Sequence, residues 1–556
     1  MKQTIIIILL ALFAVTTQAK KHKKFNPTQI MASMTVPADW FKTDTICIKG
    51  RIEGYDADKF GFTSMECSFD DVFENDQSIV LVMGIAPDGT FCKKFLASYP
   101  VQQVFSTTDS KLSFRSIPFF ARPGETIDIT VRQTEQGKYE CVYNSGSSKD
   151  VERWLSTRED FSHAFSPLWY FEGKFDEANE VADSVWQMAM NKLQELISSE
   201  NYTPMETQLA MADVQARFGV DYLGCIVKQA DALVKYEKRD GVYQTVILDS
   251  AEWKKYGDVN TYEPLRRIDF DNPLLFASQH FYFLQNRIQC ARPVDLLYEG
   301  GMRVTFDCYS KMLADRLAAL LGLMGDDHDN LMAQFCAYKD FTFHFDTFRE
   351  DGDTYQSMLT NPKLTEEQKQ RNIDHWPTLD KMMPIYLDAL KHPYFRQKAE
   401  QFRDRKLSQK DLTTALPFTP AAALIRKLAA KYPGKFLFID FWGMSCGPCR
   451  AAIQESKELR AEIAKRDDVK LIFIAGESTA EGSDAYKKYV AEWLAGEEAV
   501  CVTNQDFTRL QELFGFAAIP HYETITPDCR RVREDLQIQG FYNFDSEFKK
   551  LKEKLK

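Results

Sequence analysis

The chain has 556 residues, of which 44% are hydrophobic and 27% are charged, and its formal net charge at pH 7 is -11. A chain of this length is too long for a single hydrophobic core, so roughly three domains are expected. The composition is that of a folded globular protein and excludes a largely disordered one. The negative charge argues against a nucleic-acid-binding protein, which would normally present a basic face.

Residues 1–19 have the layout of a secretory signal peptide. Lys2 precedes an apolar run from Ile5 to Val15, and Thr17-Gln18-Ala19 supplies the small residues that signal peptidase inspects. The run is shorter than the about 20 apolar residues of a membrane-spanning helix. We therefore expect export to the periplasm or cell envelope and removal of this segment. An amino-terminal anchor that is not cleaved is the alternative.

Residues 20–148 are predicted to form a β-sandwich-like domain of about seven short strands. Apolar residues at every second position mark two of these strands, with Ile46, Ile48 and Ile52 in one and Ile127, Ile129 and Val131 in the other. This period indicates strands with one buried face. No cluster of residues in this segment has a catalytic pattern.

Residues 149–410 are predicted to form a helical domain. One apolar face has helical spacing and consists of Ala182, Trp186, Met190, Leu193 and Ile197. Similar faces run from Leu313 to Met324 and, more weakly, from Met382 to Leu390. Such faces are expected to pack in the core and not to hold a cofactor.

Two features of the helical segment could bind a metal ion, but a structural interpretation is preferred for both. The acidic run from Asp326 to Asn330 lacks the Gly and the distal Glu of a calcium loop, and a polar loop that caps a helix explains it better. His344 has no second His three or four residues away, so a packed core histidine is expected. We therefore predict no metal site and no bound cofactor.

The chain has 12 cysteines, of which only Cys446 and Cys449 have the C-x-x-C spacing. They lie between an apolar strand, predicted from Lys435 to Trp442, and a helix that begins near Cys446. A thiol at a helix amino terminus faces unpaired N–H groups, which lower its pKa below the free value of about 8.5. Cys449 lies on the same side of the first turn, so the two sulfurs can form a disulfide. A zinc site would need two further ligands at comparable spacing, and the sequence supplies none.

The segment from Asp440-Phe441-Trp442 to Cys446-Gly447-Pro448-Cys449 resembles the thioredoxin superfamily signature. The downstream order of predicted strands and helices agrees with it, and Ile519-Pro520 matches the cis-proline of the family. The extra helix expected from Ser483 to Ala495 is similar to that of the TlpA/ResA branch of exported thiol–disulfide reductases. The resemblance implies an α/β thioredoxin fold for residues 411–556.

Three catalytic roles follow from the resemblance. Cys446 is the expected attacking thiolate, and Cys449 is expected to resolve the mixed disulfide. Asp440 matches the buried acid that exchanges a proton with the second cysteine, and a carboxylate exposed at a strand end is the alternative.

The resemblance also implies a substrate-binding surface beside the two cysteines. Pro520 and Ile519 are expected to present backbone to the substrate, while Gly447 and Pro448 leave room for it. Trp442 is expected to pack beside the active loop, and an ordinary core aromatic is nearly as good an explanation.

The sequence therefore predicts a periplasmic thiol–disulfide oxidoreductase that reduces protein disulfides. Its expected partners are protein clients and a membrane electron donor such as a disulfide-reducing transporter. It is not expected to bind nucleic acid. One alternative is an envelope binding or scaffold protein with a vestigial thioredoxin domain. A thiol peroxidase would need a Pro and a Thr just before the reactive cysteine, and Met444-Ser445 does not provide them.

Overall fold

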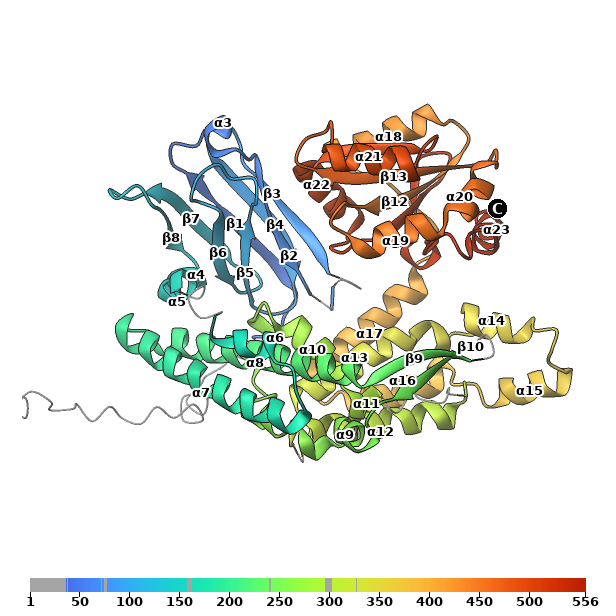
Figure 1. Cartoon of the computed structure of the whole chain (residues 1–556), viewed down its shortest axis with the longest axis horizontal. Coiled ribbons are helices and arrows are strands. Elements are labelled where there is room, and N and C mark those ends of the chain that lie inside the picture. The colour runs from blue at the N-terminus through green and yellow to red at the C-terminus, as the bar shows by residue number, and fades with distance from the viewer. Residues whose placement is uncertain are drawn as a thin grey trace, which may run out of the picture.

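The computed structural model describes residues 37, 39–71, 73–74, 78–157, 163–239, 242–295, 303–326 and 328–556. The predicted signal peptide, residues 1–19, lies outside the described residues. Along the described chain a β-rich region is followed by a helical region and then by an α/β region (Figure 1). In these parts of the chain no helix is long and apolar enough to cross a membrane.

The β-rich region consists of two four-stranded sheets, in the orders β4-β1-β7-β8 and β3-β2-β5-β6. Their strands are β1 (Asp44–Ile52), β2 (Ser64–Phe69), β3 (Ile79–Gly84), β4 (Thr90–Ala97), β5 (Val101–Ser106), β6 (Ser116–Ala121), β7 (Thr126–Gln133) and β8 (Tyr139–Ser145), and the short helix α3 (Ala57–Phe60) follows β1. The alternating residues behave as the sequence predicts, since Ile46, Ile48 and Ile129 are fully buried. The two sheets contain one strand more than the about seven that turn spacing indicates.

The helical region forms a broad layer beneath the other two regions (Figure 1). Its helices are α4 (Ser147–Asp150), α5 (Glu152–Thr157), α6 (Ser166–Tyr170), α7 (Phe175–Ser199), α8 (Pro204–Ala232), α9 (Ser250–Tyr256), α10 (Phe281–Gln289), α11 (Arg292–Asp295), α12 (Phe306–Met324), α13 (Leu331–His344), α14 (Asp353–Leu359), α15 (Glu366–Asp374), α16 (Leu379–Ala389) and α17 (Pro393–Ser408). The predicted apolar faces lie on α7, α12 and α16. As predicted, Asn330 caps α13 and His344 is buried.

A β-hairpin interrupts the helical region, and the sequence analysis did not predict it. Strands β9 (Val234–Arg239) and β10 (Val242–Ile247) pair antiparallel. Strand β10 is rich in β-branched and aromatic residues, which favour strands, whereas most residues of β9 are charged, so β9 carries little strand signal.

The β-rich and helical regions share one hydrophobic core. A single cluster of buried side chains extends from Trp40 to Phe402. The Phe73 ring lies 4.8 Å from that of Tyr338, and Trp154 Nε1 donates a hydrogen bond to Gln102 Oε1 over 2.8 Å. The predicted border at residue 148 therefore marks a change from strands to helices, and the hydrophobic core continues across it.

The α/β region contains a six-stranded sheet in the order β11-β16-β15-β12-β13-β14. The strands are β11 (Thr413–Ala415), β12 (Phe436–Trp442), β13 (Val469–Glu477), β14 (Glu498–Thr503), β15 (His521–Ile525) and β16 (Arg530–Val532). The helices are α18 (Pro420–Lys431), α19 (Gly447–Glu455), α20 (Lys457–Ala464), α21 (Asp484–Trp493), α22 (Asn504–Phe514) and α23 (Phe544–Lys554). Separate clusters of buried side chains cover the two faces of the sheet. The last strand ends at Val532, and the 3₁₀ turn Glu534–Leu536 follows it.

Helix α22 docks the α/β region onto the edge of the β-rich region. Glu512 Oε1 accepts a hydrogen bond from the Val82 backbone N–H of edge strand β3 over 2.8 Å, and it also pairs with Lys93 of β4. Gln505 Oε1 accepts from Thr63 N and Thr63 Oγ1 over 3.2 and 2.9 Å. This polar contact satisfies part of an exposed sheet edge and fixes how the α/β region sits.

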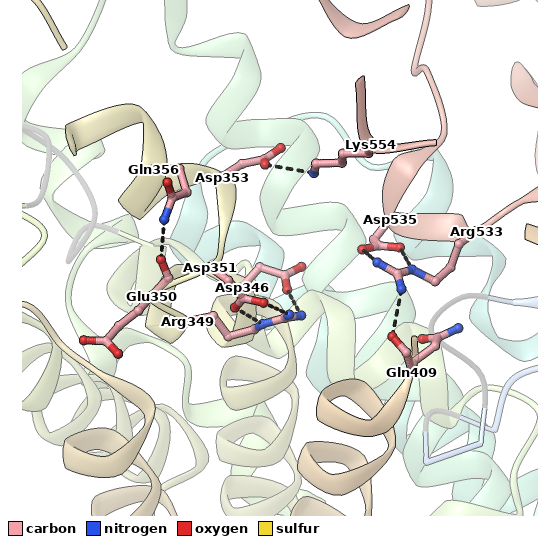
Figure 2. A network of polar contacts seen from close by, with 10 residues as sticks. All are labelled: Asp346, Arg349, Glu350, Asp351, Asp353, Gln356, Gln409, Arg533, Asp535 and Lys554. Atoms are coloured by element: carbon pink, nitrogen blue, oxygen red, sulfur yellow. Dashed lines mark hydrogen bonds and ion pairs between the residues drawn. The ribbon is translucent and has the colours of Figure 1, made fainter. Parts of the chain in front are cut away.

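A second polar contact joins the α/β region to the helical layer (Figure 2). Lys554 of α23 donates to Asp353 of α14 over 3.2 Å. Arg533 pairs with Asp535 and also donates to the Gln409 carbonyl oxygen over 2.9 Å, at the end of α17. The α/β region thus contacts both other regions through polar side chains.

Candidate active site

The two motif cysteines lie where β12 ends and α19 begins. Cys446 and Cys449 are joined by a disulfide, with their Cα atoms 5.3 Å apart. Cys446 is the N-cap of α19, and the Cys449 N–H points at its Sγ over 3.1 Å. Pro448 occupies the first turn, where its missing N–H costs nothing. The apolar strand, short loop and helix of the sequence prediction are therefore present.

The two cysteines differ in exposure as the sequence predicts. Cys446 is half-buried, whereas Cys449 is 1% exposed and packs in the core beneath α19. Gly447 and Pro448 are exposed beside Cys446. A partner that approaches this surface meets the Cys446 sulfur before that of Cys449.

The Ile519–Pro520 peptide bond is cis, as predicted, and it lies beside the disulfide. The Cys446 Sγ atom is 3.7 Å from the Ile519 carbonyl oxygen. Pro520 is exposed and Ile519 half-buried, and the Ile519 side chain reaches the loop at Gly443. These residues form one wall of the surface around Cys446.

Asp440 is buried in the strand that leads to the motif. It is 2% exposed, and its neighbours two positions away, Phe438 and Trp442, belong to the same core cluster as Cys449. The side chain of Asp440 therefore points to the sheet face that α19 covers. Desolvation raises the pKa of Asp440 to about 8, so at neutral pH the carboxyl is mostly protonated while the disulfide is formed. The burial of the Asp440 side chain excludes the alternative of a carboxylate exposed at a strand end.

A buried ion pair lies near Asp440, and sequence reasoning did not find it. Arg460 of α20 is fully buried, pairs with Glu497 and donates to the carbonyl oxygens of Ile453 and Trp493, each over 3.0 Å. The Arg460 charge acts to lower the Asp440 pKa and the Glu497 charge acts to raise it, although desolvation outweighs both.

The only sequence signal for Arg460 is its spacing of three from the buried Ile463, which places it on the apolar face of α20. Apart from this spacing, Arg460 lies in a run of charged residues and has the sequence pattern of a solvent-exposed side chain. Glu497 carries no such signal, because it follows Gly496 in a loop.

The predicted contact between Trp442 and a substrate is not supported. Trp442 is fully buried, and its ring packs between Tyr486 at 5.7 Å and Tyr489 at 5.2 Å. Both tyrosines come from α21, the extra helix expected before the third strand. Trp442 therefore supports the loop from within, which is the core-aromatic explanation.

Groups of three or more His, Cys, Asp or Glu residues that could hold a metal ion do not occur in the described parts of the chain. The groups that the site does offer are a disulfide at a helix amino terminus, one accessible sulfur, a buried second sulfur and a protonated carboxyl in the preceding strand.

No family model and no curated protein matches this chain. Among solved structures, the thioredoxin domain of a thiol–disulfide oxidoreductase from Bacteroides vulgatus is similar at 19% identity, over 21% of this chain and 82% of its own, with a TM-score of 0.19. A secreted disulfide oxidoreductase from Mycobacterium tuberculosis is similar at 16% identity, over 18% of this chain and 70% of its own, with a TM-score of 0.16. The N-terminal domain of PilB from N. meningitidis is similar at 22% identity, over 22% of this chain and 85% of its own, with a TM-score of 0.18.

The strand order, the helix that carries the cysteine pair and the cis-proline define the α/β region as a thioredoxin-like fold. In this fold three parallel strands, β12, β13 and β14, continue through β15 into an antiparallel edge. The prediction of a thioredoxin-like fold in this part of the chain is confirmed at this level.

Proposed function

We propose that the chain is a thiol–disulfide oxidoreductase that reduces disulfides of exported proteins through Cys446 and Cys449. The observation that carries the proposal is the asymmetry of the pair. The half-buried sulfur caps a helix beside the cis-proline, and the second sulfur is buried one turn inward. A purely structural disulfide would need neither arrangement.

The reaction proceeds through a mixed disulfide. In the reduced protein, the Cys446 thiolate is favoured by the helix amino terminus and attacks one sulfur of the client disulfide. A Cys446–client disulfide forms, and the other client sulfur leaves as a thiolate. The Cys449 thiolate then attacks Cys446 Sγ and displaces the first client sulfur. Two electrons and the two thiol protons pass to the client, and the Cys446–Cys449 disulfide remains.

Asp440 serves the second step by exchanging a proton with the Cys449 thiol. The Cys449 thiol is buried and must lose its proton before it can attack. A carboxyl with a pKa of about 8 in the oxidised state is well matched to exchange that proton near neutral pH. Asp440→Asn should therefore slow release of the mixed disulfide more than its formation.

The sequence supports both the proposed direction of transfer and the proposed partners. The Gly447-Pro448 dipeptide resembles that of thioredoxin, a reductant at about -270 mV, and not that of an oxidant near -120 mV. Outside the cytoplasm a reductant must be recharged, so a membrane electron donor is part of the proposal, as are a periplasmic location and a place in the TlpA/ResA branch. The α22 contact with β3 and β4 holds the redox face in a fixed orientation for clients.

The test is a comparison of Cys446→Ser and Cys449→Ser in the full chain. Cys446→Ser should lose all reaction with disulfide substrates, and Cys449→Ser should accumulate reducible adducts because nothing resolves them. Cys529→Ser, which removes a half-buried thiol elsewhere in the region, is the control and should behave as wild type. Equal trapping by both motif variants would refute the assigned roles. Absence of disulfide turnover by the wild-type chain would favour the scaffold alternative.

A further inference from the structure

Two cysteines of the β-rich region lie with their sulfurs in contact. Cys47 Sγ of β1 and Cys92 Sγ of β4 are 3.8 Å apart. Both side chains point to the outer face of the sheet, where Cys92 is exposed and Cys47 half-buried. Neither takes part in the site at Cys446. We propose that Cys47 and Cys92 are a second redox pair, which forms a reversible disulfide with a soluble disulfide as oxidant.

The register of the two strands explains why the bond would be reversible. Cys47 lies opposite Lys94 and Cys92 lies opposite Lys49, so the cysteines are diagonal neighbours. Diagonal Cα atoms are typically about 7–8 Å apart, whereas relaxed disulfides span at most about 6.8 Å. Closing the bond therefore requires the strands to shift, and strained disulfides are the more easily reduced ones.

The position of β4 allows such a shift. It is the edge strand of its sheet, with β1 as its ladder partner, and on its other side a single bridge joins Phe91 to Ile85. The hydrophobic residues that alternate with Cys92, Phe91 and Phe95, point to the opposite face into the core. A small shift of β4 near Cys92 can therefore leave these apolar side chains in the core.

The exchange has two steps and needs no further reagent. Cys92, the more exposed sulfur, attacks a small-molecule disulfide such as oxidised glutathione and releases one glutathione thiolate. Cys47 then attacks the Cys92 sulfur of the mixed disulfide and releases the second. Oxidation of the two thiols to a disulfide releases two electrons, which reduce the glutathione disulfide, and the two thiol protons end on the two glutathione molecules. Burial and the nearby Cys92 sulfur raise the pKa of Cys47, which suits the role of the later, resolving thiol.

The test uses the full chain incubated with oxidised glutathione, alkylated and digested for mass spectrometry. A peptide cross-linked between Cys47 and Cys92 is expected in the wild type and in Cys446→Ser, and excess reduced glutathione should remove it. Formation in Cys446→Ser makes the result independent of the function proposed for the other pair.

In Cys47→Ser the cross-link should be lost and Cys92 should retain glutathione, because no neighbour displaces it. Cys529, a half-buried thiol in the α/β region, is the internal control and should never enter the cross-link. Persistent glutathione on Cys92 in the wild type, or a free Cys92 thiol at every glutathione ratio, would overturn the proposal.

Discussion

Asp440→Asn tests the burial of a protonatable carboxyl beneath the redox pair. In the oxidised folded chain the pKa of Asp440 is raised from 3.8 to about 8, chiefly by desolvation. As pH rises from 4, the unfolded state therefore loses this proton first. Ionisation then favours the unfolded state increasingly until about pH 8, where the folded state also loses the proton. Asparagine has a similar shape and does not titrate, so the variant should lack this dependence.

The magnitude follows from the size of the pKa shift. One pKa unit corresponds to about 1.4 kcal/mol. Between pH 6 and pH 8 the unfolded-state carboxyl is ionised throughout, whereas the folded-state carboxyl becomes half ionised only at the upper end. The free energy of unfolding of the wild type should therefore fall by about 2 kcal/mol relative to Asp440→Asn over this interval.

The measurement is urea unfolding of the oxidised full chain at pH 6 and pH 8, for wild type and variant. Asp468→Asn is the matched control. Burial acts to raise the Asp468 pKa, but hydrogen bonds from Arg466 and Lys552 outweigh it, and the pKa is lowered. Asp468 is thus ionised in the folded and unfolded states over the whole interval. The difference in free energy of unfolding between Asp468→Asn and wild type should therefore be the same at pH 6 and pH 8. The same null result for Asp440→Asn would refute a raised pKa and, with it, the proton exchange with Cys449.

Three further predictions concern the surroundings of the site. Arg460→Leu should lower the free energy of unfolding by about 3 kcal/mol, because it leaves Glu497 largely buried without its cation. The double variant Arg460→Leu/Glu497→Leu should recover most of this loss in urea unfolding. An equal loss in the double variant would contradict the pairing. Glu512→Ala should accelerate hydrogen exchange at the Val82 amide, whereas Glu512→Gln, which keeps an acceptor oxygen, should not; equal rates in both would mean that the contact does not protect this edge. Residues 1–19 should be missing from protein isolated from the envelope, and mass spectrometry that finds them intact would refute cleavage.

The redox motif could be found from the sequence because its physics is local. A thiol at a helix amino terminus, a proline in the first turn and a second cysteine one turn on are all set by spacing within a few residues. The burial of Asp440 was expected from the resemblance to a known family, and the structure places it on the face of Phe438 and Trp442. Pro520 lies far away in sequence, and the resemblance to a known family was needed to place it beside Cys446.

The arrangement around the motif could not be predicted, because it depends on segments that are distant in sequence. Arg460 and Glu497 become a pair only when α20 and the loop before β14 meet. The sequence pattern around Trp442 is the same whether its ring faces a client or the core. In the structure, tyrosines of α21 cover the ring, so it lies in the core.

The sequence by itself determined that Cys446 and Cys449 lie where a strand gives way to a helix, and the order of the surrounding elements, since hydrophobic period and capping act over neighbouring residues. Only the tertiary structure decided that the β-rich and helical regions share a core, and that the sulfurs of Cys47 and Cys92 touch. The shared core depends on packing between the regions, and the contact between the two sulfurs depends on strand register. Composition and periodicity do not indicate which distant segments pair.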